Sequence, residues 1–336
     1  MKICSFTEYG MLKEVIVGSG FGMTDQAIDF SFKVFYKEFY DWGWLVGSDT
    51  KIQINSRYVR ELEEDIQGFV KVLESAGVKV HRPKRMTRVN KIATPDWTSE
   101  TIPALNVRDQ CIILGNAIVE TPCMLRNRYF ENALLKDIFE EAFMDGARWL
   151  NMPRSSLTSN SLENFSEMLM DGAQLVRFGD HVLVNCTNPS HDLAFSWFQR
   201  EFPDIQFHKI HSCVSNHLDS YIVPVAEGTL LLRDKSFLEQ MPSFLKDWNI
   251  LYSPRPTESQ FPVYSKEDTI LTTPFIDMNC LALGNNRVIV NSLFPELCEL
   301  LSDNGLEVLE VPHRHRRIFA GGWHCFTLDL LREESA

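Results

Sequence analysis

A cysteine near the end of the chain stands in a setting that suits a nucleophile. Cys325 follows Gly321 and Gly322 in the run Gly-Gly-Trp-His-Cys, and it begins the alternating, strand-like run 326–330. Glycines allow the backbone to approach a substrate closely. The thiolate is the reactive form of cysteine, and a nearby imidazole or a bound cation lowers the pKa of the thiol. The sequence therefore predicts a cysteine nucleophile at this position.

Acidic and histidine residues occupy the equivalent place ahead of other strand-like runs. Asp109 and Asp171 each precede one such run, and His217 and Asp219 precede another. Asp109 and Asp219 could bind a planar guanidinium through its fork of N–H donors and leave its central carbon open to attack. His217 can shuttle protons, and Asp171 can hold its tautomer. Each residue alone is more often a turn or core residue, so the prediction depends on their matched positions.

An internal repeat explains why these positions match. One unit consists of a strand, a tight turn, a second strand, a helix and a closing strand. Four copies have Gly-containing turns between two strand-like runs, which is a hairpin signal. These turns lie at 114–117, 178–181, 226–229 and 283–286, and the helices expected after them at 128–142, 193–202, 237–246 and 295–302.

A fifth copy is split between the two ends of the chain. A second strand at 13–17, a helix at 56–75 and a closing strand at 78–80 lie near the start, and the missing first strand is 326–331. The ends then interlock and close a ring. The sequence thus predicts an α/β fold, a five-bladed α/β propeller of five ββαβ units with pseudo-fivefold symmetry. An ordinary mixed α/β sandwich is the alternative.

We expect residues 1–336 to form one catalytic domain. The aromatic-rich insert 21–54 is a candidate lid or dimer contact, with ordinary packing as the alternative, and the loop 253–273 is expected near the substrate mouth. The net charge of −12 argues against a nucleic-acid partner. Eight cysteines without a CxxC pair, no apolar run of membrane length and no leader pattern predict a reduced, cytoplasmic protein without a membrane partner.

The chain from Lys13 to Arg332 resembles the amidinotransferase family of the guanidine-modifying pentein superfamily, whose members include glycine amidinotransferase and inosamine-phosphate amidinotransferases. The fold of that family, a five-bladed ββαβ propeller, agrees with the repeat. The stretches that carry the resemblance are Arg108-Asp109, 115–120, 126–131, Asp171-Gly172-Ala173, His217-Leu218-Asp219, Met278-Asn279 and 321–325.

The resemblance implies a ping-pong transfer without a metal or organic cofactor. L-Arginine gives its amidino group to Cys325 and leaves as ornithine, and a small amine acceptor then takes the group. By the resemblance His217 is the acid and base, Asp171 its partner, and Asp109 and Asp219 the guanidinium clamps. A homodimer is expected. The remaining residues expected in the substrate site are Arg108, Asn216, Thr273, Met278, Asn279 and Gly322.

The chain departs from the family pattern in three places. Gln174 replaces the second acid of an Asp-Ala-Ala-Asp run, and Asn216 replaces a methionine near the acceptor pocket. Ser236 stands where glycine amidinotransferase has the arginine that holds the amino-acid carboxylate, so Arg233 or Lys235 is the candidate replacement. The identity of the acceptor therefore does not follow from the resemblance.

Three alternatives stay open. A guanidine hydrolase of the arginine deiminase type has a nearly identical catalytic set, and formation of citrulline instead of ornithine would reveal it. A pentein that only binds ligand would leave Cys325 unlabelled by a thiol probe. A zinc protein is the third, since a cluster within 208–219 contains potential ligands, namely His208, His211, Cys213, His217 and Asp219.

Overall fold

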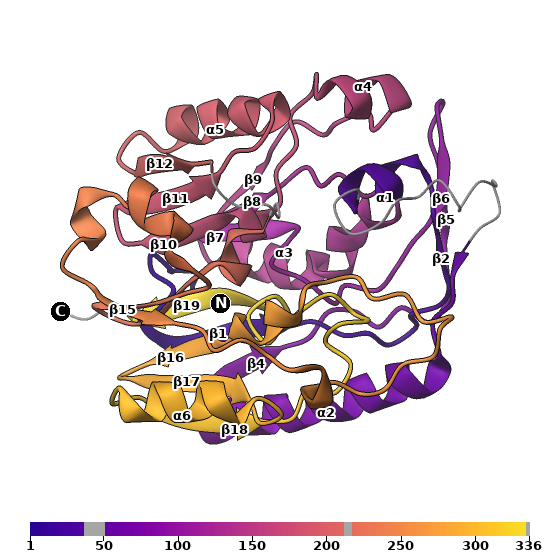
Figure 1. The fold of residues 1–336 in the computed structure, drawn as a ribbon. Helices are drawn as coiled ribbons and strands as arrows, with labels where there is room; N and C mark the ends of the chain where they lie inside the picture. Colours follow the sequence, from indigo (N-terminus) through magenta and orange to yellow (C-terminus); the bar gives the residue numbers. More distant parts are fainter. Residues whose placement is uncertain (37–50, 212–216, 334–336) are drawn as a thin grey trace.

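Three-stranded sheets of a single topology recur along the chain. The computed structural model describes residues 1–36, 51–211 and 217–333. Within these ranges five sheets have three strands each. In every one, the first strand pairs antiparallel with the second, and the second pairs parallel with the third. In Figure 1 the long helices lie at the periphery and the sheets lie toward the interior.

Four of these sheets follow one another in sequence, and each begins with a predicted hairpin. The turn at Asn285 and Asn286 has φ values of 52° and 57°, as a two-residue turn between twisted strands requires. The strands of the four sheets are β7 (Cys111–Leu114), β8 (Ala117–Glu120) and β9 (Arg148–Asn151); β10 (Leu175–Phe178), β11 (His181–Asn185) and β12 (Gln206–Ile210); β13 (Ile222–Ala226), β14 (Thr229–Leu232) and β15 (Asn249–Tyr252); and β16 (Leu281–Gly284), β17 (Arg287–Asn291) and β18 (Glu307–Val311).

The fifth sheet joins the two ends of the chain, as predicted. Strand β1 (Met11–Val17) pairs antiparallel with β19 (Thr327–Glu333) and parallel with β4 (Lys79–His81). The prediction of a unit split between the termini is therefore confirmed. Because β19 begins two residues after Cys325, the pairing with β1 fixes the backbone that carries the thiol.

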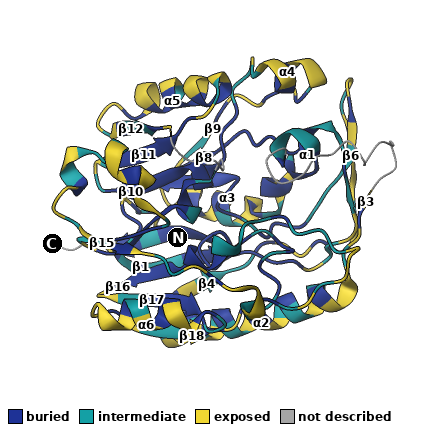
Figure 2. Ribbon diagram, viewed as in Figure 1, coloured by how far each residue is buried: buried dark blue, intermediate teal, exposed yellow. Residues whose placement is uncertain are grey.

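Helix α2 (Ser56–Ser75) has the predicted bounds. The Asn55 side chain caps its N-terminus by accepting a hydrogen bond from the backbone of Arg57. Leu62, Phe69 and Leu73 are fully buried in the same core cluster as β1. Figure 2 shows this pattern along α2, with buried residues on one side and exposed residues on the other. Helices α5 (Pro189–Glu201) and α6 (Pro295–Asp303) also lie where helices were expected.

Two predicted helices are wrong in length or type. In place of 128–142, two 3₁₀ turns, η2 (Arg126–Arg128) and η3 (Glu131–Leu134), precede a short helix α3 (Lys136–Met144). The buried polar contacts of Arg128 and Glu131 hold this backbone out of a regular helix. In place of 237–246 there are the 3₁₀ turns η6 (Lys235–Gln240) and η7 (Ser243–Leu245). Pro242 interrupts them, because it lacks an N–H and forces the preceding residue into an extended conformation.

The segments between the sheets contribute short elements. Short pairs are β2 (Gln26–Ala27) with β3 (Lys51–Ile52), and β5 (Lys91–Ala93) with β6 (Thr98–Glu100). Two short helices are α1 (Phe30–Phe35) and α4 (Ser159–Asn164), and the 3₁₀ turns are η4 (Gly172–Gln174), η5 (Leu218–Ser220), η8 (Glu258–Gln260) and η9 (Pro274–Met278). No helix in the described ranges is long and apolar enough to cross a bilayer.

Candidate active site

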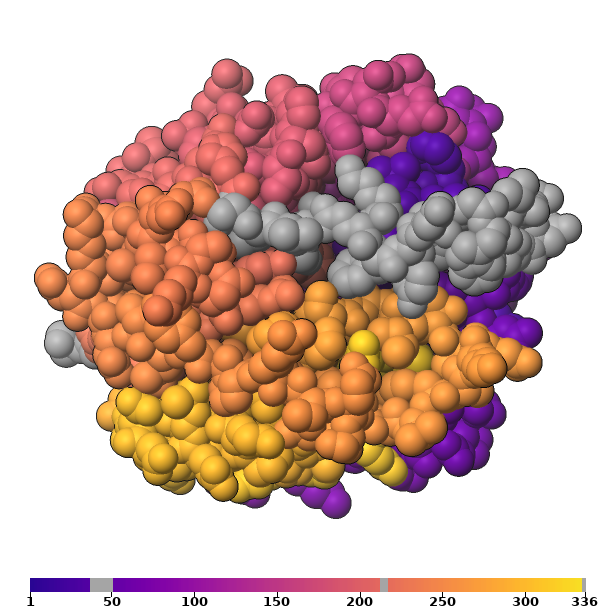
Figure 3. Space-filling view, viewed as in Figure 1, coloured from indigo at the N-terminus to yellow at the C-terminus, as the bar shows by residue number. Residues whose placement is uncertain are grey.

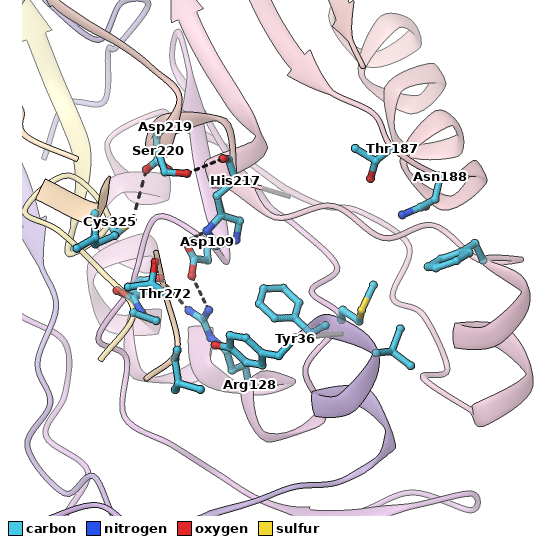
Figure 4. A pocket seen from close by; sticks show the side chains of 18 residues that line it. Tyr36, Asp109, Arg128, Thr187, Asn188, His217, Asp219, Ser220, Thr272 and Cys325 are labelled. Carbon is cyan, nitrogen blue, oxygen red and sulfur yellow. Dashed lines mark hydrogen bonds and ion pairs between the residues drawn. The ribbon is translucent and has the colours of Figure 1, made fainter. Parts of the chain in front are cut away.

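A cavity of about 210 Å³ brings together residues from distant parts of the chain. Figure 4 shows Cys325, Asp219, His217 and Asp109 close together on one side of it. In the space-filling view, atoms of α1 lie beside those of α4 (Figure 3). Val34 and Phe35 of α1, and Phe165 directly after α4, form part of the cavity wall. The lining residues are Val34, Phe35, Tyr36, Asn106, Asp109, Met124, Arg128, Phe165, Thr187, Asn188, His217, Asp219, Ser220, Leu271, Thr272, Ile276, Ala320 and Cys325.

Cys325 is held at the cavity by the loop that precedes β19. Its backbone N–H donates to Asn279 Oδ1 at 2.8 Å, and its Sγ lies 3.5 Å from Asp219 Oδ2. Burial and the negative charges of Asp219 and Asp109 raise the pKa of the thiol well above its usual value. Both effects favour the protonated thiol, and the positive charge of a cation beside the sulfur would lower its pKa again.

His217 lies between two carboxylates. Its Nε2 is 2.9 Å from Asp171 Oδ2, and its Nδ1 is 3.8 Å from Asp109 Oδ1. Burial disfavours the charged ring, but Asp109 and Asp171 outweigh it and raise the pKa of His217 to about 9. Near neutral pH the ring is therefore an imidazolium, which can give a proton to a departing amine.

Asp109 shares its charge with a buried arginine. Arg128 Nη1 donates to Asp109 Oδ2 at 2.6 Å, while Arg128 Nε and Nη2 donate to Glu131 at 2.6 and 2.9 Å. Burial raises the pKa of Asp109, although His217 and Arg128 oppose the shift. The other oxygen, Asp109 Oδ1, has no hydrogen-bond donor within the described protein.

Asp219 is arranged in the same way. Its Oδ2 lies 2.8 Å from His324 Nδ1, and its Oδ1 has no hydrogen-bond partner among the described residues. Burial alone would raise the pKa of Asp219, but His324 and then His217 lower it. Each of the two carboxylates thus keeps one buried oxygen that accepts no hydrogen bond from the described residues, in the cavity that contains the thiol. Such an arrangement favours a cationic ligand with several N–H donors.

Several residues expected to contact substrate lie elsewhere. Arg108 is absent from the cavity lining, because its guanidinium donates to Glu8, Asp329 and the carbonyl of His324. Met278 is fully buried in a hydrophobic cluster with β13, β17 and α6. Both expectations are corrected. The guanidinium of Arg108 is occupied by internal ion pairs and hydrogen bonds, and the side chain of Met278 packs in the core.

Three further residues act at the edge of the site. Asn279 fixes the cysteine loop, since its Oδ1 and backbone oxygen accept from Cys325 N and His324 N. Gly322 packs so closely that an added Cβ would be 2.6 Å from Asn279. Thr273 caps η9, and its neighbour Thr272 lines the cavity instead. None of the three is among the described residues that line the cavity, and their direct contact with substrate stays a prediction.

The remaining sequence-based candidates divide between described and undescribed residues. Asn216 and Cys213 lie outside the described residues. His208 Nε2 is 2.9 Å from His181 Nδ1, and His211 Nδ1 is 2.9 Å from the carbonyl of Cys186. Within the described ranges no group of three His, Cys, Asp or Glu side chains is arranged to hold a metal ion.

The structure adds wall residues that the sequence did not single out. Arg128 belongs to the stretch 126–131 that carried the resemblance, so its presence had a signal. No sequence signal pointed to Thr187 and Asn188. They lie between β11 and α5, and Figure 4 places them across the cavity from Cys325. The ring of His191 holds this pair in place, with its Nδ1 3.2 Å from both Thr187 N and Thr187 Oγ1.

Known proteins of similar sequence share one activity in their names. An inosamine-phosphate amidinotransferase of Streptomyces griseus is 31% identical, over 97% of this chain and 95% of its own. This chain belongs to the amidinotransferase family. An L-arginine:L-lysine amidinotransferase of Pseudomonas savastanoi pv. phaseolicola is 27% identical, over 98% of this chain and 94% of its own. The chain is therefore a transferase of amidino groups. No protein-family profile matches it.

Solved structures agree with the sequence relatives. The saxitoxin-pathway amidinotransferase of Microseira wollei superposes with a TM-score of 0.87 at 27% identity, covering 99% of this chain and 98% of its own. The S. griseus enzyme superposes with a TM-score of 0.88, covering 99% and 97%. A dimethylarginine dimethylaminohydrolase, 15% identical with a TM-score of 0.61 and covering 95% and 99%, shares the fold alone. The fold is thus the pentein fold, which transferases and hydrolases have in common.

Proposed function

We propose that this protein transfers the amidino group of L-arginine to a small amine through an amidino-Cys325 intermediate. The observation that carries the proposal is a pair of buried oxygens, Asp109 Oδ1 and Asp219 Oδ1, that accept no hydrogen bond from the described residues. They lie in the cavity that also contains Cys325 and His217. Buried carboxylate oxygens without donors are costly. A guanidinium supplies N–H donors in the plane that two carboxylates can share, and leaves its central carbon facing the sulfur.

In the first half-reaction the bound guanidinium lowers the pKa of Cys325, and the thiol proton passes to solvent. The thiolate attacks the central carbon and forms the C–S bond. The His217 imidazolium then gives its proton to the departing nitrogen as the C–N bond breaks, so ornithine leaves as a neutral amine and takes up a proton in water. Asp171 keeps the ring oriented through the 2.9 Å contact.

In the second half-reaction the acceptor amine occupies the place that ornithine has left. Neutral His217 takes a proton from the attacking nitrogen, the new C–N bond forms, and the C–S bond breaks to return the thiolate. The product guanidinium stays paired with Asp109 and Asp219 until it is released. One imidazole therefore serves as acid in the first step and base in the second.

The donor carboxylate requires a cation, and Arg233 is the candidate we favour. Its guanidinium lies 4.6 Å from the ring of Tyr221 and 4.5 Å from that of Phe275, and Ser220 and Ile276, their neighbours in sequence, line the cavity. No ion pair among the described residues involves Arg233. Lys235 is exposed and lies over Tyr252, so it is the weaker of the two sequence-based candidates.

We further propose that the five sheets form the five blades of a propeller, and that the protein is a cytoplasmic homodimer. The repeated antiparallel–parallel topology supports the first point. The names of relatives in saxitoxin and inosamine-phosphate chemistry favour a role in natural-product biosynthesis. Light scattering of the purified protein tests the dimer, since a monomer mass would contradict it.

The deciding experiment is intact-mass analysis after incubation with L-arginine. We expect an adduct of one amidino group on Cys325, with ornithine in solution and no citrulline. Amines such as glycine, lysine and an aminocyclitol are then added one at a time, and the acceptor is the amine that discharges the adduct. Citrulline without any amine would identify a hydrolase, and the absence of an adduct would refute the proposal.

A further inference from the structure

Asn106 lines the active-site cavity together with Asp109 and Asp219. Its side-chain oxygen Oδ1 is buried and accepts no hydrogen bond from the described residues. Among the described residues that line this cavity, the same is true only of Asp109 Oδ1 and Asp219 Oδ1. All three atoms are acceptors, and a buried acceptor without a donor is costly. The cavity therefore offers a ligand three oxygens that need hydrogen-bond donors.

The amide of Asn106 is held in one orientation by its neighbours. Nδ2 donates to the carbonyl of Phe319 at 3.3 Å. The reverse orientation would set Oδ1 against that carbonyl oxygen, so the hydrogen-bond partner identifies which amide atom is the acceptor. Oδ1 lies so close to Gly321 that an added Cβ would be 2.2 Å from it. A larger residue than glycine at this position would therefore displace the oxygen.

The turn that carries Asn106 also carries Asp109. Asp109 N donates to the carbonyl of Asn106 at 3.1 Å, and Arg128 Nη2 donates to the same carbonyl at 2.8 Å. Arg128 also donates to Asp109 Oδ2 from Nη1, and a dashed line in Figure 4 marks this contact. One buried guanidinium thus holds the backbone of one residue and the side chain of the other. Both acceptor oxygens therefore belong to a single turn that Arg128 fixes in place.

We propose that Asn106 Oδ1 accepts the N–H of the nitrogen whose bond to the central carbon of the guanidinium breaks or forms. A guanidinium has three nitrogens around one carbon, and each carries N–H donors. The two carboxylates neutralise the cation and take N–H groups of the two nitrogens that are transferred. The third acceptor is then left for the third nitrogen. It is a neutral amide, which adds no further negative charge beside the thiol. This inference rests on the proposed function.

The contact has a consequence for each half-reaction. In the first, the N–H of the departing nitrogen points at Asn106, so its developing lone pair can take the proton of His217. In the second, the attacking amine uses its lone pair for the carbon, one N–H for His217 and another N–H for Asn106. The acceptor is therefore a primary amine. A secondary amine has a single N–H and would leave one of the two protein groups without its partner, which is how a buried acceptor rejects a ligand.

A binding experiment tests the oxygen directly. Asn106→Leu and Asn106→Asp are made in the Cys325→Ala background, which removes the proposed nucleophile. The ligands are L-arginine and its amidine analogue with a methylene in place of Nε, which keeps the cation but lacks the N–H in question. Calorimetric titration gives the dissociation constant of the analogue divided by that of arginine. We expect Asn106→Leu to lower this ratio by about tenfold or more, because the acceptor that distinguishes the two ligands is gone.

Asn106→Asp is the matched control, because it keeps an oxygen acceptor and loses the N–H that donates to Phe319. Its ratio should stay at or above that of Cys325→Ala alone. A merely structural role for Asn106 predicts that both variants lower the melting temperature and weaken both ligands equally. The same result is expected if Oδ1 accepts from a water in the neighbouring cavity of about 40 Å³, which Asn106 also lines. A ratio that falls in both variants, or in neither, would overturn the inference.

A second measurement follows the reaction and keeps the inference testable if Asn106→Leu does not fold. Asn106→Ala removes the same oxygen with a smaller side chain. The adduct formed from L-arginine is discharged by L-ornithine, in reversal of the first step, or by Nδ-methyl-L-ornithine, its secondary-amine counterpart. The wild-type preference for the primary amine should fall by about fivefold or more in the variant, as rapid-quench rates would show. An unchanged preference would contradict the inference while leaving amidino transfer intact. If wild-type protein forms no arginine adduct, the proposed function itself fails.

Discussion

Two groups of buried charges lie side by side in this protein, and they differ in how completely they are paired. The central ionic network consists of Glu8, Arg108, Arg177, Asp329 and Arg332. Every carboxylate oxygen in it accepts at least one guanidinium N–H; Asp329, for example, accepts from all three arginines at 2.7 to 2.9 Å. The cavity next to it contains Asp109 and Asp219, and one oxygen of each accepts no hydrogen bond from the described residues. His324 touches both groups.

This difference in pairing indicates that the ionic network stabilises the fold and that the cavity binds a ligand. Buried charges are tolerated when they are paired and hydrogen-bonded. The network meets that condition with protein groups alone, so it can join the two ends of the chain and the strands β1 and β19. The cavity meets it only in part, and the missing donors are those that a guanidinium would bring. The sequence alone does not distinguish the ionic network from the cavity, because each is a set of Asp, Glu and Arg residues ahead of or within strands.

The largest effect is expected for the thiol. Cys325→Ala should abolish turnover and adduct formation while the melting temperature stays near that of wild type, because the change removes only a sulfur atom that borders the cavity. Intact mass and differential scanning calorimetry measure the two quantities. Normal activity in this variant would show that Cys325 is not the nucleophile and that its role in the cavity is at most in binding.

Breaking the network should unfold the protein instead. Asp329→Asn removes a charge that three arginines share, and we expect a loss of about 3–5 kcal/mol in the free energy of unfolding. Urea titration followed by circular dichroism measures it. At temperatures where the variant is folded, its KM for L-arginine should stay within about twofold of wild type. A large KM change with unaltered stability would contradict the division between the two groups.

Asp109→Asn is the corresponding change in the cavity. Arg128 keeps its two hydrogen bonds to Glu131, so stability should change little. Binding of a guanidinium should weaken by about 2–4 kcal/mol, because one of its two carboxylates is lost from a buried site. Calorimetric titration with L-arginine into the Cys325→Ala background isolates binding from chemistry. If only the maximal rate changed, Asp109 would have a different role.

The rate of the donor half-reaction should depend on pH, with a smaller effect than the substitutions above. The pKa of His217 is raised to about 9, so the imidazolium is present below that pH and is lost as pH rises through it. The donor half-reaction needs this proton, and its rate at saturating arginine should fall roughly tenfold per pH unit above 9. Quenched-flow analysis of adduct formation from pH 7 to 10.5 measures it, and His217→Asn should lack this limb. A rate that keeps rising through pH 10 would argue against His217 as the acid.

The smallest effect is expected for Met278, which the sequence-based prediction placed in the substrate site and the structure places in the core. Met278→Leu conserves volume in a core cluster and should cost less than about 1.5 kcal/mol of stability. Because Met278 does not line the cavity, kcat and KM should be unchanged in a steady-state assay. A tenfold rise in KM for the donor would place this side chain back in the substrate site.

Local patterns predicted the fold where they were strong. Helix α2 and the four hairpins follow from apolar periodicity, capping residues and turn residues, all of which act over a few positions. The joining of β1 with β19 was predictable because the first four copies showed which strand the fifth lacked. The segments around Arg128 and Pro242 were predicted poorly, since a tertiary ion pair and a proline interrupt the helical pattern there.

The site was predictable as a set of residue types, and less so as a set of contacts. The sequence named Cys325, His217, Asp109 and Asp219, which the structure brings together in one cavity. It also named Arg108, although Arg128 is the arginine in the cavity wall. The two lie close in sequence, and nothing local shows which of them the buried carboxylates of the N- and C-terminal segments will pair with.

The sequence alone determined the repeat, the residues that begin each unit and the presence of a thiol after paired glycines, because strand and turn preferences and chemical identity are local properties. Only the tertiary structure decided which charges are balanced. Pairing depends on distances between residues up to hundreds of positions apart, such as Glu8 and His324. That one oxygen each of Asp109 and Asp219 accepts no hydrogen bond becomes visible only after every donor among the described residues has been placed.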